Sequence, residues 1–164
     1  MKGPDVSLRH LQRALTMELT TINTYLLQAA KLEDWGLDVL AARMEAEIEE
    51  EREHAKAFLE RILFLEGEAD VSTLDPIGQD RSIRDVYQTQ LKMELEARSY
   101  YDHAAREARE AGDLGTFDLF RAILADEEEH IDFVETQFHL MELMGEQLYV
   151  SRQVSDVAKH DDDD

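Results

Sequence analysis

Two segments of the sequence carry a glutamate followed three residues later by a histidine. The pairs are Glu51 with His54 and Glu127 with His130. In an α-helix, residues three positions apart lie on one face, one turn from each other, so each pair can offer a carboxylate and an imidazole to the same ion. These ligand types suit Fe(II), Mn(II) or Zn(II) and leave coordination positions free for dioxygen or water. The spacing therefore indicates a metal centre, although a single such pair in a Glu-rich helix is more often solvated.

An internal repeat strengthens this interpretation. At an offset of 76 residues the second Glu–His pair matches the first, and the same offset relates Glu18 to Glu94, Tyr25 to Tyr101 and Gly36 to Gly112. Because the chain is rich in acidic residues, a single Glu match at this offset can arise by chance. Matches of several residue types at the same offset are not expected by chance. Each half of the chain therefore supplies one Glu-x-x-His motif and one upstream glutamate.

The hydrophobic pattern places these glutamates inside the protein. Each one interrupts an apolar seam with helical spacing, as Glu18 does between Leu15 and Ile22. Buried carboxylates without a counter-charge are costly or become protonated, and bound metal ions remove this conflict. Four Glu and two His from four facing helices are the ligand set of a dinuclear carboxylate centre. The predicted ligands are Glu18, Glu51, His54, Glu94, Glu127 and His130.

Residues beside these ligands also have predicted roles. Glu50 and Asp126 each precede a ligand glutamate, and we expect them to accept the second ring N–H of the histidine ligands. Tyr25 is the candidate for donating to a ligand carboxylate or giving up an electron, whereas Tyr101 is expected to be a core packing residue. The remaining histidines and most acidic neighbours are expected at the surface: His10, His103, His139, His160, Glu47, Glu49, Glu53, Glu128 and Glu129.

Helical periodicity along most of the chain predicts an all-α fold. Helices are expected over 7–34, 37–65, 83–111 and 116–144, with a short fifth helix after Gly145. The polar segment 67–82 contains Pro76 and Gly78 and breaks the pattern. Because it is long enough to run the length of a bundle, helices two and three can be parallel. The prediction is a ferritin-like four-helix bundle with one long crossover between helices two and three.

The composition bounds the class of protein. The 164 residues predict one domain over 1–158 and a disordered acidic tail over 159–164. A net charge of −21 argues against nucleic-acid binding and permits cation handling. The absence of cysteine excludes disulfides, thiolate zinc sites and thiolate-ligated iron–sulfur clusters. No signal peptide and no run near ~18 apolar residues is present, so we expect a cytoplasmic protein without a membrane partner.

The chain resembles a bacterioferritin along nearly its whole length. The similar segments are "MKG" at the start, "INTYLLQAAKLEDWGL", "HAKAFLERILFLEG" and "DEEEHIDFVETQ". The resemblance implies a shell of twenty-four subunits that oxidises Fe(II) to Fe(III) with dioxygen or peroxide at an intrasubunit di-iron centre and stores the ferric mineral. It also implies individual roles for the ligands: Glu18 and Glu94 as terminal carboxylates, Glu51 and Glu127 as bridges, and His54 and His130 as one nitrogen ligand per iron.

One position departs from the bacterioferritin pattern. In that family haem b lies between two subunits and is held by one Met from each, but Arg52 occupies the matching position here. A guanidinium cannot ligate haem iron. The simplest expectation is a haem-free homo-oligomer, and the alternative is a shell mixed with a Met-bearing, haem-binding paralogue. The family's inner-surface iron site also differs, with Ala46 and Glu50 in place of the typical His and Asp.

Apolar residues away from the core seams predict subunit contacts. The segment "ILFL" at 62–65 is apolar around a full turn, and Leu19 and Leu26 lie off the seam of the first helix.

Two alternatives to iron storage stay open: a di-iron oxidase or peroxidase without storage, and an assembly subunit of a mixed haem-containing shell. A DNA-protecting mini-ferritin fits less well, because its metal site would lie between subunits.

Overall fold

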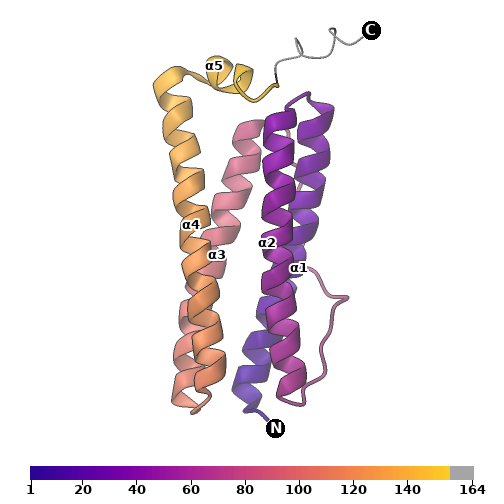
Figure 1. Cartoon of the computed structure of the whole chain (residues 1–164), viewed down its shortest axis with the longest axis vertical. Coiled ribbons are helices and arrows are strands. Elements are labelled where there is room, and N and C mark those ends of the chain that lie inside the picture. Colours follow the sequence, from indigo (N-terminus) through magenta and orange to yellow (C-terminus); the bar gives the residue numbers. More distant parts are fainter. Residues whose placement is uncertain (156–164) are drawn as a thin grey trace, which may run out of the picture.

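The computed structural model describes residues 1–155. The predicted domain end at 158 and the predicted tail 159–164 lie outside the described residues. Within residues 1–155 the structure contains helices and no strand (Figure 1). The helices are α1 (Asp5–Asp34), α2 (Asp38–Phe64), α3 (Ile83–Glu110), α4 (Leu114–Met144) and α5 (Glu146–Ser151). The all-α prediction is confirmed, and the ends of the four long helices lie within two residues of the predicted ends.

Two antiparallel helix pairs make up the bundle, and each pair is closed by a matching glycine turn. Gly36 follows α1 and Gly112 follows α3, both with a φ of 78°. Glycine adopts this left-handed conformation without the steric cost that a Cβ would bring. After Gly36 the N–H of Leu37 donates to the carbonyl of Leu32 at 2.9 Å, which ends the helix with a hydrogen-bonded turn. The repeat in the sequence is therefore also a repeat in the backbone.

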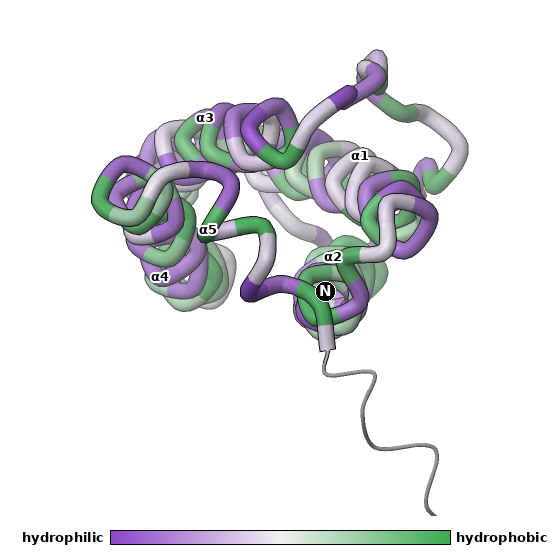
Figure 2. Tube along the Cα trace, turned by 90° about the horizontal axis from the view of Figure 1, so that it is seen from above, coloured by the Kyte–Doolittle hydropathy of each residue, from purple (hydrophilic) through white to green (hydrophobic). Residues whose placement is uncertain are grey.

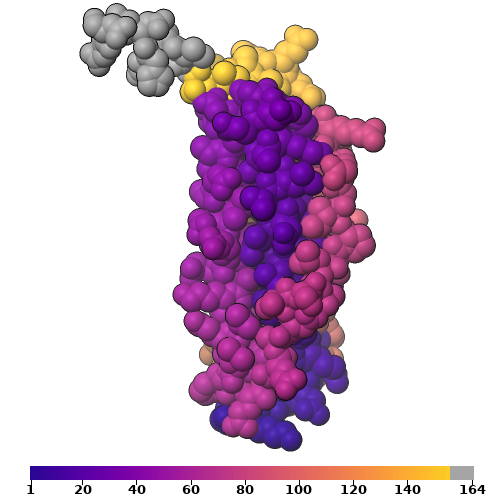
Figure 3. Space-filling model, turned by 90° about the vertical axis from the view of Figure 1, so that its right-hand side faces the viewer, coloured from indigo at the N-terminus to yellow at the C-terminus, as the bar shows by residue number. Residues whose placement is uncertain are grey.

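The crossover between the pairs runs the length of the molecule beside α1 (Figures 1 and 3). Side chains of α1 hold it in place. Arg13 pairs with Asp75 at 2.8 Å, and the amide of Gln28 donates to Asp80 at 2.6 Å. Because the chain returns to the starting end before α3 begins, α2 and α3 run parallel, and the predicted crossover topology is confirmed.

Seen along its long axis, the bundle has α1 and α3 on one side and α2 and α4 on the other (Figure 2). Two apolar clusters fill the interior. One contains Leu32, Met44 and Val86, and the other contains Phe58 and Phe120. The six predicted metal ligands belong to neither cluster and lie on the helices between them. Within the described residues, no helix is long and apolar enough to cross a membrane.

Asp113 links the start of α4 to the end of α2. Its carboxylate accepts hydrogen bonds from the backbone N–H of Thr116 at 3.1 Å and from the Thr116 hydroxyl at 2.7 Å, which makes it the N-cap of α4. It also pairs with Arg61 of α2 at 2.6 Å. Burial works to raise the pKa of Asp113, but the hydrogen bonds from Thr116 and Arg61 outweigh it and hold the pKa below its ordinary value.

We expect Asp113→Asn to destabilise the protein by about 1–3 kcal/mol at neutral pH, because the amide still caps the helix but leaves Arg61 without its counter-charge. The folded pKa of Asp113 is depressed, so this contribution is present above the unfolded pKa and is lost as pH falls through the folded value. Thermal midpoints of both proteins should therefore converge in acid. The matched control is Asp118→Asn on the exposed face of α4. An equal effect of the two substitutions contradicts the prediction.

Candidate metal centre

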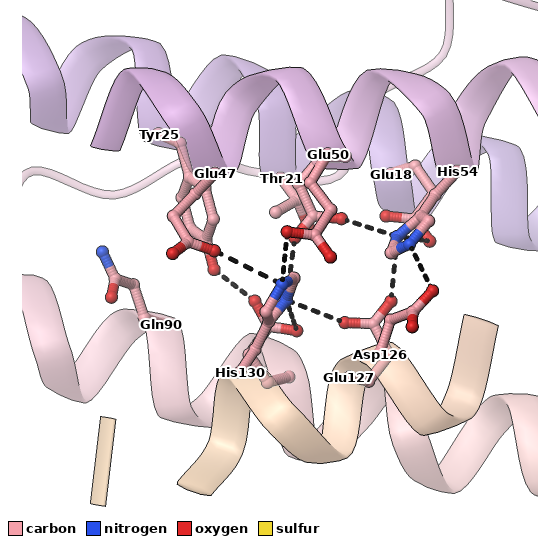
Figure 4. Close-up of polar contacts among 12 residues, drawn as sticks. Glu18, Thr21, Tyr25, Glu47, Glu50, His54, Gln90, Asp126, Glu127 and His130 are labelled. Carbon is pink, nitrogen blue, oxygen red and sulfur yellow. Dashed lines mark hydrogen bonds and ion pairs between the residues drawn. The ribbon is translucent and has the colours of Figure 1, made fainter. Parts of the chain in front are cut away.

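The structure brings together all six residues predicted as ligands, halfway along the bundle. One glutamate comes from α1 and one from α3, whereas α2 and α4 each contribute a glutamate and the histidine one turn further on. None of the six exposes more than 9 % of its surface. The residues are Glu18, Glu51, His54, Glu94, Glu127 and His130, and Figure 4 shows the centre from the side. The groups therefore converge in the core, as the apolar seams predict.

Their contacts divide the centre into two halves that share two carboxylates. Nδ1 of His54 lies 3.1 Å from Oε2 of Glu51 and 3.4 Å from Oε1 of Glu127. Nδ1 of His130 lies 3.4 Å from Oε1 of Glu51 and 3.5 Å from Oε2 of Glu127. Each shared glutamate thus turns one oxygen toward each histidine, which is the arrangement a bridging carboxylate needs.

Glu18 and Glu94 each belong to one half only. Glu18 lies 4.0 Å from Nδ1 of His54, and Glu94 lies 3.9 Å from Nδ1 of His130. The two sets of converging ligand atoms are therefore Glu18, Glu51, His54 and Glu127 on one side, and Glu51, Glu94, Glu127 and His130 on the other. Glu18 and Glu94 thus contact one histidine each, whereas Glu51 and Glu127 contact both, as the terminal and bridging roles implied by the resemblance to bacterioferritins would require.

Several buried polar atoms of the centre lack a hydrogen-bond partner. They are Oε1 of Glu51, both carboxylate oxygens of Glu127, and both ring nitrogens of His130. Buried polar groups are normally hydrogen-bonded, because an unpaired one loses its hydration without compensation. All of the unpaired atoms except Nε2 of His130, which faces Glu47 and Glu50, converge on the space between the two halves. Cations bound there would satisfy them, so the residues present fit a pair of metal ions.

Protons neutralise this centre when cations do not. Burial raises the pKa of Glu18 and of Glu94 well above the ordinary value, and the nearby Glu127 carboxylate adds to the effect. Burial works to lower the pKa of His54, but contacts with Glu127 and Glu51 outweigh it and raise the pKa to about 11. The pKa of His130 is raised for the same reasons. Metal ions must therefore displace protons to bind.

Two tyrosines hold the terminal carboxylates. The hydroxyl of Tyr25 donates to Oε1 of Glu94, and that of Tyr101 donates to Oε1 of Glu18 at 2.5 Å. The hydrogen bond predicted for Tyr25 is present, whereas the expectation that Tyr101 only packs was wrong. Tyr101 does pack against Phe58, with ring centroids 5.5 Å apart, but it also stands in the position that the repeat makes equivalent to Tyr25. The offset of 76 residues could have predicted both contacts.

Carboxylates on the α2–α4 side face the outer nitrogens of the two histidines. Nε2 of His54 lies 3.2 Å from Asp126, and Nε2 of His130 lies 3.4 Å from Glu50. Asp126 thus accepts from His54 as predicted, whereas Glu50 contacts His130 without a hydrogen bond between them, and each carboxylate faces the histidine of the other helix. Glu47 lies 3.3 Å from Nε2 of His130 with its side chain only 18 % exposed, so the expectation that it faces solvent was wrong.

The face formed by α1 and α2 around Arg52 carries both charged and apolar side chains. The guanidinium of Arg52 pairs with Glu49 at 2.7 Å, and its side chain is 60 % exposed. Beside it, Leu19, Leu59 and Val71 line a shallow groove. Leu26 on α1 is also exposed, as are Leu63 and Phe64 at the end of α2. Leu63 and Phe64 are thus free to contact another subunit as predicted, but the expectation was wrong for Ile62 and Leu65, which are buried in the core of this chain.

The histidines outside the centre differ from one another. His103 and His139 are exposed, as expected, and His160 lies outside the described residues. His10 is buried, contrary to expectation, because it packs against α3 and pairs with Glu107 at 2.6 Å. No periodic signal in the sequence marks it, since the contact depends on how α1 and α3 are placed relative to each other.

Known proteins resemble this chain along most of its length. The Ferritin-like domain family matches residues 8–144. The bacterioferritin of Mycobacterium leprae is 40% identical over 156 residues, which cover 94% of this chain and 98% of that protein. The bacterioferritin of Brucella melitensis is 38% identical over 149 residues, or 91% of this chain and 92% of that protein. The solved structure of Mycobacterium tuberculosis bacterioferritin BfrA superimposes with a TM-score of 0.92 at 36% identity, covering 94% and 98% of the two chains.

Proposed function

Because the chain belongs to the bacterioferritin family of ferritin-like proteins, we propose that it takes up Fe(II) as substrate, oxidises it to Fe(III) and stores the product. The reaction takes place at the six-residue centre, with dioxygen or peroxide as the oxidant. The observation that carries this proposal is the sharing of both oxygens of Glu51 and Glu127 between the two histidines. A site for a single ion would not require two carboxylates that each face both histidines.

The protein's own residues prepare the centre for this chemistry. When bound, the two iron ions supply two electrons, which reduce dioxygen to hydrogen peroxide or peroxide to water. Asp126 accepts from Nε2 of His54, and Glu50 faces Nε2 of His130, so that each Nδ1 is left to face the centre. Tyr25 and Tyr101 fix the terminal carboxylates through hydrogen bonds.

The α2–α4 side offers a route for cations. Glu47, Glu50 and Asp126 are partly exposed, with side-chain exposures of 18%, 49% and 46%, and each contacts a histidine of the centre. A chain with a net charge of −21 attracts cations from solution. We therefore place the path of Fe(II) to the centre along these carboxylates.

Storage requires a shell, and we propose a cytoplasmic homo-oligomer of twenty-four copies. The test is to oxidise Fe(II) with the purified protein, separate the mixture by size and measure iron in the protein fraction. Storage predicts many iron atoms per chain in a particle much larger than one subunit. A di-iron oxidase without storage keeps its iron as a cofactor and predicts no more than about two iron atoms per chain, one for each half-site; this outcome would contradict the storage function.

We expect Asp126→Asn to weaken Zn(II) binding at the centre about 10- to 100-fold, as loss of a carboxylate behind a histidine ligand typically does. The reason is that the amide no longer favours the His54 tautomer whose Nδ1 can bind a cation. Calorimetric titration with Zn(II) measures the change. The matched control is Asp132→Asn on the exposed face of α4, and equal affinities of the two variants would refute the assigned role.

We also propose that a shell made of this chain alone binds no haem, because Arg52 stands where the family's haem-ligating Met is found. The protein purified from haem-replete cells should lack a Soret band. Arg52→Met should introduce one if the groove beside Leu19 and Leu59 meets its copy in the shell. A stoichiometric Soret band in the unsubstituted protein would show that haem is held by another ligand or by a different subunit.

A further inference from the structure

A second cluster of potential metal ligands lies on the opposite side of the bundle, between α1 and α3. It consists of His10 on α1 and of His103 and Glu107 on α3. Their ligand atoms, one from each side chain, all lie within 4.8 Å of one another. His10 precedes Glu18 by eight residues, or about 12 Å along the helix. The cluster is therefore separate from the dinuclear centre.

The helices place the three side chains on one surface. His103 and Glu107 are four residues apart and therefore neighbours on α3, with Nε2 of His103 at 3.6 Å from Oε1 of Glu107. Nε2 of His10 approaches the other carboxylate oxygen to 2.6 Å. The rings of His10 and His103 meet edge to face, with centroids 5.4 Å apart. The carboxylate thus lies between two imidazoles, one on each helix.

Tyr100 contacts His10, which is the buried residue of the cluster. Its hydroxyl lies 2.8 Å from Nδ1 of His10, and the rings are 5.5 Å apart. Histidine ligands commonly have their second nitrogen fixed by such a partner, which sets the tautomer and the direction of the ring. Without a cation, the Nε2–H of His10 donates to Glu107 and the Tyr100 hydroxyl donates to Nδ1. A cation would displace the Nε2 proton, and Tyr100 could then accept from Nδ1–H and hold the ring in place.

The cluster is charged and open to solvent. The hydrogen bond from His10, and after it the charges of His103 and Arg9, hold the pKa of Glu107 below its ordinary value, so the carboxylate is ionised at neutral pH. The side chain of Glu107 is 37 % exposed and that of His103 is 60 % exposed. An ion can therefore enter from solution and keep water on its outer side.

We propose that His10, His103 and Glu107 form a mononuclear site for a divalent transition-metal ion on the α1–α3 surface. Two imidazoles and one carboxylate with open positions suit Zn(II), Fe(II) and related ions. Mg(II) and Ca(II) prefer sites built from oxygen ligands and bind poorly to imidazole. The proposal does not depend on iron oxidation at the dinuclear centre, because it uses none of the same residues.

The test uses the assembled protein and Zn(II) as the probe. Bound zinc is counted by equilibrium dialysis for the unsubstituted protein and for His103→Ala, Glu107→Gln and the control His139→Ala. His139 and His103 are both exposed, so neither replacement removes a core side chain. We expect His103→Ala and Glu107→Gln to bind one zinc ion fewer per chain, with His139→Ala unchanged. A large excess of Mg(II) should not displace the additional ion.

Crystals soaked in Zn(II) locate the ion independently of any count. The expected result is an anomalous zinc peak between His10, His103 and Glu107 in the unsubstituted protein and no such peak in His103→Ala. Equal zinc counts in all four proteins, the absence of this peak, or displacement of the ion by Mg(II) would overturn the proposal.

Discussion

Replacing Glu127 with Gln is expected to slow the initial oxidation of Fe(II) by at least about 100-fold, beyond the loss typical of residues that only orient a ligand. Glu127 faces both halves of the centre, with one oxygen 3.4 Å from His54 and the other 3.5 Å from His130. A carboxamide offers only one good acceptor and no charge. Both half-sites therefore lose a ligand at once, and stopped-flow absorbance of ferric iron measures the effect.

The same substitution should leave the helices intact. The apolar clusters on either side of the centre remain unchanged, and Gln is nearly the same size as Glu. Glu129→Gln is the matched control, because it makes the same chemical change at an exposed position two residues further along α4. Circular dichroism confirms folding of both variants. Unchanged oxidation by Glu127→Gln, or an equal loss in Glu129→Gln, would show that the carboxylate does not act at the centre.

Zn(II) should stabilise the folded protein strongly, and more so at higher pH. At a free concentration of 100 times the dissociation constant, each ion adds about 2.7 kcal/mol, or roughly 5 kcal/mol for two half-sites. The pH dependence follows from His54, whose pKa is raised to about 11 without bound cations. Cations need the neutral imidazole and so release its proton. Binding therefore becomes tighter as pH rises.

The stability of the ion-free protein changes in the opposite direction. A raised pKa contributes stability that is complete below the unfolded value of about 6.5. That contribution is lost as pH rises toward the folded value of about 11. The rise in thermal midpoint caused by Zn(II) should thus be larger near pH 8 than near pH 6, and much smaller in Glu127→Gln. A shift that is independent of pH, or equal in the variant, would contradict ligand exchange between protons and metal at this centre.

The sequence predicts the ligands well because each one is marked by a pattern in its own segment of the chain. Glu18 and Glu127 interrupt apolar seams, and the offset of 76 residues ties them to Glu94 and Glu51. Helical spacing alone then decides that these side chains face the core. The sequence pattern does not predict which glutamates bridge and which are terminal, because this depends on how the four helices are shifted along one another. That division came from the resemblance to bacterioferritins, and it stays a prediction that the contacts of Glu51 and Glu127 with both histidines support.

The residues that the sequence missed act between helices rather than along one. Glu47 looks like another solvent-facing acid, yet it reaches His130 of α4 at 3.3 Å. His10 lies beside the seam of α1, and only the packing of α3 buries it against Tyr100 and Glu107. Periodicity reports which face of a helix is apolar, but not which polar side chain of a neighbour lies opposite. Such contacts need the three-dimensional arrangement.

The most direct test of the central claim is an aerobic titration of the purified, iron-free protein with Fe(II), followed by stopped-flow absorbance. Two half-sites in one chain predict a rapid phase whose amplitude stops growing at two Fe(II) per chain, followed by slower oxidation with the ferric product retained in the particle. A rapid phase that saturates at one Fe(II) per chain, or the absence of a rapid phase, would contradict an intrasubunit dinuclear centre.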